Sequence, residues 1–152
     1  MNPYLSVLIQ AALPIWELRG ALPVALKVYH LPLWQAFLIC VAGNIIPVIF
    51  WIYFLEGISK FLMERFKFWR NFFNWLFERT RKKHSRRFEV WGDLALIAFV
   101  AIPLPFTGGW TGSVAAFVFG VPPKKSIPLI LAGIIIAGII VAIFILSLNK
   151  VL

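Results

Sequence analysis

The stretch PIWELRGALP, residues 14–23, interrupts an otherwise apolar segment that extends from Asn2 to Leu26. A continuous transmembrane helix would lose backbone hydrogen bonds at the two prolines and would carry Glu17 and Arg19 into hydrocarbon. We therefore expect the chain to turn back here as a re-entrant hairpin instead of crossing the membrane. The expected tip of this hairpin contains Pro14, Gly20 and Pro23.

A second apolar run, from Leu94 to Pro123, is interrupted in the same way. Residues typical of loops crowd its centre, at a depth where loops exposed to lipid are not tolerated. We expect a second re-entrant hairpin here. Its predicted tip contains Pro103, Pro105, Thr107, Gly108, Gly109, Trp110, Thr111 and Gly112.

Each interrupted run is followed by a clean one, Val28–Leu55 and Ser126–Asn149, and both are longer than the ~20 residues of a transmembrane helix. Leu31–Leu55 aligns with Val121–Ile145, and in a register one residue shorter Pro14 aligns with Pro103. Interrupted segments at corresponding places in two halves are typical of inverted-repeat transporters, so the pattern predicts two copies of hairpin and span. Two ordinary spans kinked by proline are the alternative.

The composition indicates that lipid is the solvent for most of the chain. The 152 residues are 61% hydrophobic and only 14% charged, whereas a soluble domain is about 25% charged. Cys40 is the single cysteine, which excludes a fold built on disulfides. We expect one all-α membrane domain over residues 1–152, divided into repeat one (1–55), a basic segment (56–92) and repeat two (93–152).

The basic segment has a pattern of its own. Ten of the fifteen Lys and Arg residues lie between Lys60 and Arg87. Polar residues recur there at three- and four-residue steps opposite an aromatic stripe, which predicts an amphipathic helix in the membrane interface, followed by a loop, over residues 56–92. The basic charge primarily indicates a cytoplasmic location. As an anionic-lipid surface, it would use Arg79, Arg81, Lys82, Lys83, Arg86 and Arg87.

The two hairpins have a consequence for topology. If all four runs cross the membrane, Lys124 and Lys125 lie outside the cell with Lys27. If the interrupted runs are hairpins, both lysines join the basic segment in the cytoplasm and both termini lie outside. Counting positive charge on the inside favours the hairpins.

Glu17 and Arg19 are the candidate proton or substrate site. On a regular helix, two residues this close in sequence would point about 200° apart, whereas a non-helical tip lets both enter one cavity lined by Thr107, Trp110 and Thr111. Burial and a neighbouring cation act in opposite directions on the protonation of a carboxyl group, and the planar guanidinium suits a phosphate or carboxylate. A purely structural ion pair is the alternative.

Hydrogen-bond accounting predicts that the two tips touch. Each tip leaves backbone groups without helical partners, and an unpaired group is costly in hydrocarbon. The other tip is the only protein expected at that depth with groups to match. We therefore expect Glu17 and Arg19 to face residues 107–111 across the membrane midplane.

The sequence supports neither an enzyme nor a cofactor. It has no nucleophile elbow, no phosphate-binding loop and no pair of embedded carboxylates. His30 and His84 are too isolated to form a metal site. Nucleic-acid binding is not expected either, because the aromatic side chains of the basic segment lie on the stripe that enters the membrane.

Two motifs, ELRGALP at 17–23 and PLPFTGGWTG at 103–112, together resemble the small multi-drug export protein family, over nearly the whole chain. That family is similar to the DedA (SNARE-associated Golgi protein) superfamily of membrane proteins with two re-entrant hairpins. The resemblance implies proton-linked movement of lipids or lipid-linked phosphates, with an acidic residue and arginines at the tips. Glu17 and Arg19 match the first tip, but residues 100–112 lack the arginines of the DedA pattern.

The expected function is that of a small secondary transporter or lipid flippase, multi-pass in the cell inner membrane, which moves an amphiphilic or anionic lipid-like substrate or a drug. Glu17 would exchange a proton and Arg19 would hold an anionic head group. The alternative is a non-transporting scaffold that binds anionic lipid or a protein partner through residues 56–87. The expected partners are the bilayer, anionic lipid head groups, protons and further copies of the chain.

Overall fold

The computed structural model describes residues 2–81, 86–104 and 107–151, and this part of the chain contains seven helices and no strand. The predicted all-α class is therefore confirmed. Three residues of the predicted sites, Lys82, Lys83 and Pro105, lie outside the described residues.

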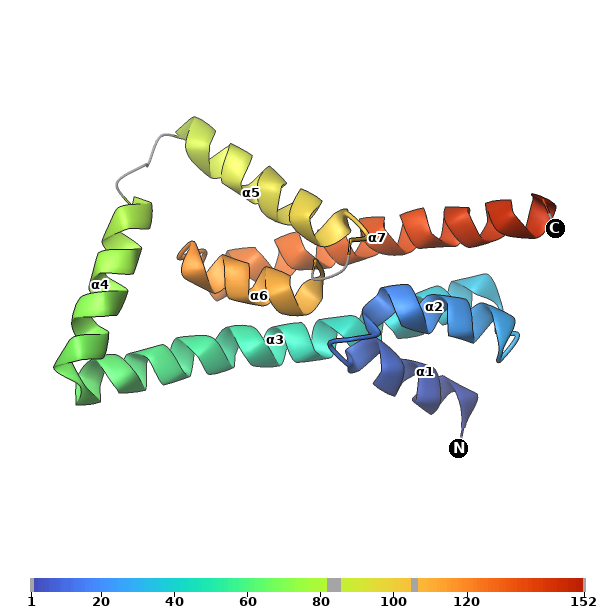
Figure 1. The fold of residues 1–152 in the computed structure, drawn as a ribbon, viewed down its shortest axis with the longest axis horizontal. Helices are drawn as coiled ribbons and strands as arrows, with labels where there is room; N and C mark the ends of the chain where they lie inside the picture. Colours follow the sequence, from blue (N-terminus) through green and yellow to red (C-terminus); the bar gives the residue numbers. More distant parts are fainter. Residues whose placement is uncertain (1, 82–85, 105–106, 152) are drawn as a thin grey trace.

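Two long helices, α3 (Leu33–Arg65) and α7 (Pro123–Val151), lie side by side and run in opposite directions through the molecule (Figure 1). Both are long and apolar enough to cross a membrane, and only 33% and 39% of their most apolar windows are buried inside the fold. The outward positions are also large and apolar, including Phe50 on α3 and Phe144 on α7. A helix that is apolar on every side requires an apolar solvent, so the chain is a membrane protein.

Two pairs of shorter helices flank the long ones. The first pair is α1 (Pro3–Ala12) with α2 (Glu17–Lys27), and the second is α5 (Arg86–Ala101) with α6 (Gly109–Val118). In each pair the first helix runs to the centre of the molecule and the second returns toward the end from which the chain came (Figure 1).

Proline explains where the first helix of each pair ends. Leu13 precedes Pro14 and is extended, with φ −76° and ψ 141°, because the proline ring disfavours the helical conformation of the residue before it. Ile102 stands in the same relation to Pro103, directly after the last residue of α5. Both interruptions therefore form where the sequence predicts them.

The tips are shorter than predicted, since several predicted tip residues are helical. Gly20 and Pro23 lie inside α2, and the predicted tip residues from Gly109 to Gly112 form the first turn of α6. Pro23 removes only one backbone hydrogen bond from a short helix. Gly20 is packed against Trp16, because a Cβ atom there would lie 2.6 Å from the indole ring.

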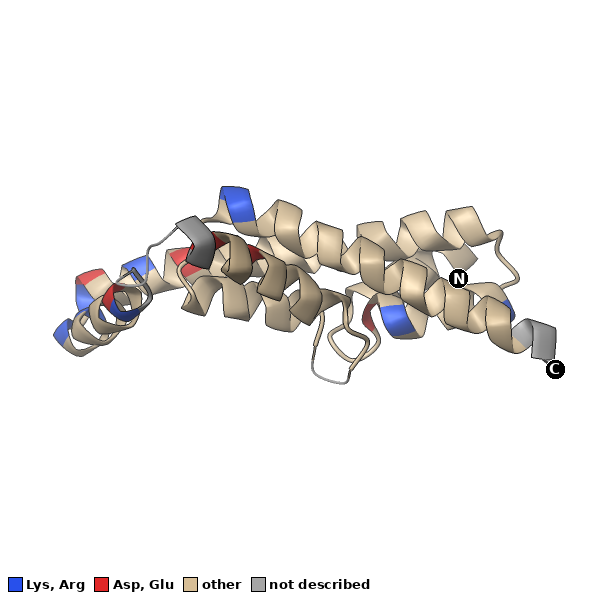
Figure 2. Cartoon of the chain, turned by 90° about the horizontal axis from the view of Figure 1, so that it is seen from above, with Lys and Arg blue, Asp and Glu red and all other residues tan. Residues whose placement is uncertain are grey.

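The amphipathic helix of the basic segment begins later than the sequence pattern indicates. The chain continues α3 to Arg65, is extended at Phe66 with φ −127° and ψ 122°, and then begins α4 (Lys67–Arg81). Figure 1 shows α4 running across the end of the molecule, transverse to α3. Most charged residues of the described chain lie at this end, around α4, the end of α3 and the starts of α5 and α7, and others lie at the centre of the molecule (Figure 2).

Arg70 stabilises the break between α3 and α4. Its guanidinium donates hydrogen bonds to the carbonyl oxygens of Met63 (2.9 Å) and Glu64 (3.4 Å), in the last turn of α3. These carbonyls have no partner within the helix, and a cation is favourable at a helix C-terminus. A side chain that follows the break therefore ends α3, without the glycine or proline that sequence reasoning looks for.

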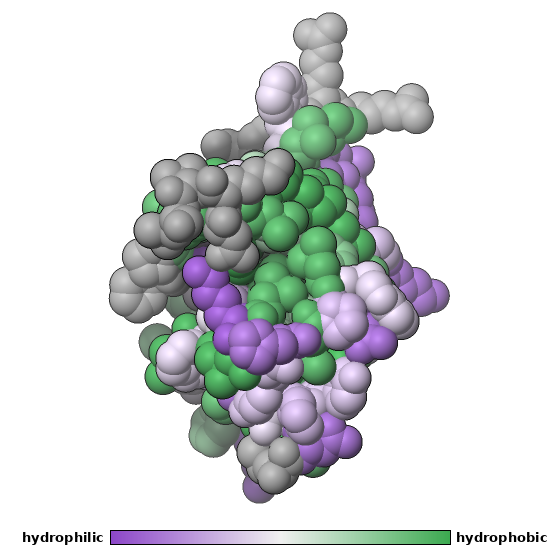
Figure 3. All heavy atoms as spheres, turned by 90° about the vertical axis from the view of Figure 1, so that its right-hand side faces the viewer, coloured by the Kyte–Doolittle hydropathy of each residue, from purple (hydrophilic) through white to green (hydrophobic). Residues whose placement is uncertain are grey.

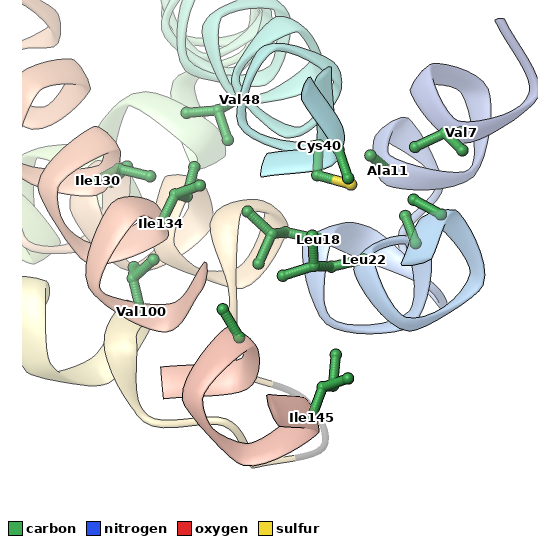
Figure 4. Close-up of a cluster of buried hydrophobic side chains, with 14 of the residues drawn as sticks. Val7, Ala11, Leu18, Leu22, Cys40, Val48, Val100, Ile130, Ile134 and Ile145 are labelled. Atoms are coloured by element: carbon green, nitrogen blue, oxygen red, sulfur yellow. The ribbon is translucent and has the colours of Figure 1, made fainter. Parts of the chain in front are cut away.

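The buried core joins both halves of the chain. Val7 of α1, Leu18 of α2 and Cys40 of α3 belong to one buried cluster, which continues to Val100 of α5 and Ile134 of α7 (Figure 4). Viewed from the end that carries the C-terminus, the surface shows broad apolar areas beside hydrophilic ones (Figure 3). The core sets the two interrupted segments against each other at the centre of the molecule.

Candidate functional site

Arg19 of α2 binds the C-terminal end of α5. One terminal nitrogen, Nη2, donates to the carbonyl oxygens of Val100 (2.9 Å) and Ile102 (2.8 Å). The other, Nη1, donates to the carbonyl oxygen of Leu104 and to Oγ1 of Thr107 (3.0 Å). The guanidinium thus supplies the hydrogen bonds that the broken helix lacks and places a positive charge at its negative end.

Glu17 binds the N-terminal end of α6. Its Oε1 accepts a hydrogen bond from the backbone N–H of Trp110 (3.2 Å), and the carboxylate also interacts with the N–H of Gly109. The side chain is buried, with 8% exposed. A carboxylate is the favoured group at a helix N-terminus because its charge is opposite to that of the helix end.

The contact is reciprocal. Trp110 donates through its indole Nε1 to the carbonyl oxygen of Ala12 (3.1 Å), the last residue of α1, and its ring meets that of Trp51 on α3 with centroids 5.2 Å apart. Each interrupted segment therefore satisfies backbone groups of the other. The prediction that the two segments touch is confirmed.

Glu17 and Arg19 share one direction for a reason that the sequence analysis missed. Arg19 lies within helix α2, so the predicted non-helical tip around it is wrong. Glu17, the first residue of α2, has φ 43°, in the left-handed region that is uncommon for residues other than glycine. This departure from helical geometry redirects the Glu17 side chain, so both residues reach the second interrupted segment.

The hydrogen bonds of Arg19 affect its predicted role, which is to hold an anionic head group. Its four hydrogen bonds to described residues go to carbonyl and hydroxyl oxygens of the second interrupted segment. Glu17 and Arg19 have different partners and form no close ion pair in the described part of the chain. In this conformation the guanidinium forks are occupied by the protein. An anionic head group would have to replace the α5 carbonyls.

Asn44 of α3 is a member of the site that the sequence analysis missed. Its side chain, 2% exposed, interacts with the carboxylate of Glu17, while its Oδ1 has no hydrogen-bond partner in the described part of the chain. An amide near the middle of an uncharged apolar run was the available signal. The recess between these groups has no room for a water molecule and is also lined by Arg19, Val100, Gly108, Gly109, Ile134 and Ala137.

The remaining predicted residues separate into two groups. Thr107 binds Arg19, Trp110 binds Glu17, and Gly108 and Gly109 line the recess. The Thr111 hydroxyl instead donates within its own segment to the carbonyl of Gly108 (3.4 Å). Gly112 lets α6 approach α5, since a Cβ atom there would lie 2.5 Å from the side chain of Val100.

The described residues of the predicted lipid surface lie on α4 and at the start of α5, away from the turns at the centre of the molecule (Figure 1). Arg79 lies on α4, with its guanidinium 5.3 Å from the centre of the Trp75 ring. Arg81 ends α4, and Arg86 and Arg87 begin α5. The structure therefore separates a buried central site from a basic end.

A family model described as "Putative small multi-drug export protein" matches residues 17–140. The match begins at Glu17 and includes both sides of the central contact and all of α4. No curated protein and no solved structure matches the chain.

Proposed function

The chain belongs to the small multi-drug export protein family, and we propose that it is a small secondary transporter of the cell membrane, with its pathway where the two helix pairs meet. The observation that carries the proposal is the buried carboxylate of Glu17, bound to the end of a helix from the other half of the chain. Because this carboxylate lies between the two halves, its protonation can be coupled to the opening of the contact between them.

We further propose that the two helix pairs are re-entrant hairpins. Helices α1, α2 and α6 have 10, 11 and 10 residues. At about 1.5 Å per residue each spans roughly half of the ~30 Å hydrocarbon core. Hairpins that enter from opposite faces would then meet near the midplane, and the position of both turns at the centre of the molecule supports this arrangement (Figure 1).

Close helix contacts support an inverted repeat. A Cβ atom at Gly43 of α3 would lie 2.6 Å from the carbonyl oxygen of Leu8 on α1. A Cβ atom at Gly133 of α7 would lie 3.0 Å from the carbonyl oxygen of Ile97 on α5. The alignment of the two halves sets Gly43 on Gly133 and Leu8 on Ile97, so equivalent residues make equivalent contacts.

A pair of polar contacts supports the same relation. The hydroxyl of Tyr4 on α1 donates to Oε1 of Gln35 on α3 at 3.1 Å. Lys125 Nζ on α7 lies 2.9 Å from Asp93 Oδ2 on α5. Tyr4 aligns with Asp93 and Gln35 with Lys125, so each half ties its first short helix to its long helix at the same place.

The orientation follows from positive charge. The ring of Phe117, near the end of α6, meets the rings of Phe73 and Phe77 on α4, so α4 lies at the same end of the molecule as the start of α7. Lys124 and Lys125 therefore share an end with the basic segment. We place this end in the cytoplasm and the termini outside, as one multi-pass membrane domain.

The proposed mechanism uses the charge of Glu17. A charged carboxylate holds the N-terminus of α6, and a protonated carboxyl group holds it less well because the attraction to the helix end is lost. Proton uptake would therefore weaken the contact between the hairpins and free the guanidinium of Arg19 for an anionic head group. An amphiphilic or lipid-like substrate, and kinship to the DedA superfamily, belong to this proposal. We propose no enzymatic activity.

The second candidate function is a scaffold that binds anionic lipid through α4. Its support is the exposed aromatic and basic surface of that helix, which includes Phe68, Trp75 and Arg79. Such a helix, lying transverse to α3, is suited to the membrane interface. Partners of this scaffold would be lipid head groups or another protein, including a second copy of the chain.

Purified protein in liposomes with an imposed pH gradient tests the transporter, with ethidium and fluorescent phosphatidic acid as probes. We expect the gradient to drive movement of one probe, and Glu17→Gln to remove the dependence on the gradient. Glu56→Gln is the control, because Glu56 pairs with Lys60 on the exposed side of α3. Unchanged behaviour of Glu17→Gln would overturn the proposal, and a wild-type protein that moves neither probe would favour the scaffold.

A further inference from the structure

The side-chain oxygen of Asn44 is a buried hydrogen-bond acceptor without a donor among the described residues. Its Oδ1 has no hydrogen-bond partner among the described residues, although the side chain is almost fully buried. A buried polar atom without a partner is destabilising, and it is more so in a membrane, where water is scarce. A donor that is present in another state of the protein would account for it.

The surroundings of Asn44 limit the possible donors. Its Oδ1 points toward the first residue of α6, since a Cβ atom at Gly109 would lie 2.6 Å from it. The backbone N–H groups at this end of α6 are directed to Glu17. The other polar side chain on the recess, Arg19, is bound to the end of α5, and the residues contributed by α5, α6 and α7 have no titratable side chain.

Glu17 is the group that can become a donor. As a carboxylate it only accepts hydrogen bonds, but with a proton it gains one O–H. An amide offers both kinds of group, because its NH₂ donates and its oxygen accepts. Asn44, beside Glu17, can therefore pair with either state of the carboxyl group by a rotation of its amide.

We propose that Asn44 is the hydrogen-bond partner of protonated Glu17, so that the two residues form one proton-binding site. In the charged state the Asn44 NH₂ faces the carboxylate. A proton from water forms an O–H bond on the Glu17 carboxyl group, no bond breaks, and this O–H donates to Asn44 Oδ1. Arg19 is the charged group that faces the pair, and it remains protonated throughout.

This role of Asn44 rests on the proposed function. It adds a residue that pairs differently with the charged and the protonated form of Glu17. When the O–H of Glu17 turns to α3, the carboxyl group holds the N–H groups of Gly109 and Trp110 less strongly. Proton binding thus transfers Glu17 from α6 to α3. The same step satisfies the free oxygen of Asn44 and loosens the contact between the hairpins.

Infrared spectroscopy of the purified protein in lipid bilayers tests this without a transport assay. A pH titration should show the carbonyl stretch of a protonated carboxyl group that is absent in Glu17→Gln. In Asn44→Leu this band should move to higher frequency, because the O–H has lost its acceptor. Asn44→Thr, which keeps an oxygen acceptor, should remain closer to the wild type. Ser59→Ala, at another buried polar position of α3, is the control.

Two results would overturn the inference. One is a Glu17 band with the same frequency in Asn44→Leu and Asn44→Thr as in the wild type, with thermal melting showing that both variants are folded. The other is the absence of any band that Glu17→Gln removes. If Glu17→Gln loses pH-driven transport while the Glu17 band is unchanged in the Asn44 variants, the proposed function stands. Only the role of Asn44 is then rejected.

Discussion

The Glu17 carboxylate occupies the space that a side chain at position 108 would need. A Cβ atom at position 108 would lie 1.9 Å from Oε2 of Glu17, well inside van der Waals contact. The carboxylate reaches the N-terminus of α6 because this position has no side chain. Glycine is therefore required at position 108 because α2 and the start of α6 approach each other closely.

Gly108→Ala should therefore destabilise the protein. The added methyl group displaces Glu17 from α6, and overpacking of this kind lowers the free energy of unfolding by roughly 1–3 kcal/mol. Gly57→Ala is the matched control, because nothing lies within 4 Å of a Cβ atom there and alanine is favoured over glycine inside a helix by up to ~1 kcal/mol. Denaturant unfolding in detergent micelles measures both, and equal effects would contradict the contact.

The importance of the charged residues could be predicted from the sequence, but their partners could not. Glu17 and Arg19 stand out because charges are costly in an apolar run. Asn44 did not stand out, since one amide in a long span has several ordinary explanations. Only the packing of α3 against α2 and α6 places it beside Glu17.

At the scale of the helices, α2 supplies hydrogen-bond partners for the end of α5 and for the start of α6. Arg19 satisfies carbonyl groups at the end of α5, and Glu17 satisfies N–H groups at the start of α6. The two charges have opposite signs, as the two helix ends require. The break in the second interrupted segment is therefore stabilised by the first.

Arg19→Lys should destabilise the protein strongly although it keeps the charge. An ammonium group has three donors at one point and cannot span the carbonyls of Val100, Ile102 and Leu104 as a planar guanidinium does. Carbonyl groups without partners cost about 1–3 kcal/mol each, so we expect a loss of at least ~2 kcal/mol in the free energy of unfolding.

Lys27→Gln is the control for Arg19→Lys, because Lys27 is exposed at the end of α2. It should change the free energy of unfolding by no more than about 0.5 kcal/mol. Both variants are measured by the same unfolding experiment. A lysine at position 19 that is as well tolerated as the control would show that the guanidinium fork is not required.

Two helix boundaries show the limits of local signals. Pro14 and Pro103 ended helices as predicted, because the restriction on the preceding residue acts within the backbone itself. Pro23 did not end α2, and Phe66 ended α3 without any breaking residue. In the second case the decisive group is the side chain of Arg70, which binds the helix from beyond the break.

At the scale of the molecule, α3 and α7 run in opposite directions (Figure 1). Helix α1 packs on α3 and α5 packs on α7, whereas α2 and α6 each contact both long helices. The charged end formed by α4 and the start of α7 lies opposite the end that carries both termini (Figures 1 and 2). If the long helices cross the membrane, these two ends face different compartments.

Cysteine labelling in intact cells tests the orientation, in a background with Cys40 replaced by alanine. We expect a membrane-impermeant thiol reagent to label cysteines at positions 2 and 150 from outside and a cysteine at position 124 only after the cells are opened. The reason is that Lys124 shares the basic end, which positive charge retains in the cytoplasm. Labelling of position 124 from outside intact cells would reject the two hairpins.

The sequence by itself determined the helical class, the membrane as solvent and the place of both interruptions. These properties follow from composition and from local backbone restrictions, which act within a few residues. Only the tertiary structure decided that Arg19 binds Val100, that Glu17 binds the start of α6 and that Asn44 lies beside it. The partners are as much as 93 residues apart, and their contact depends on helix register, on two glycine contacts and on the left-handed backbone of Glu17.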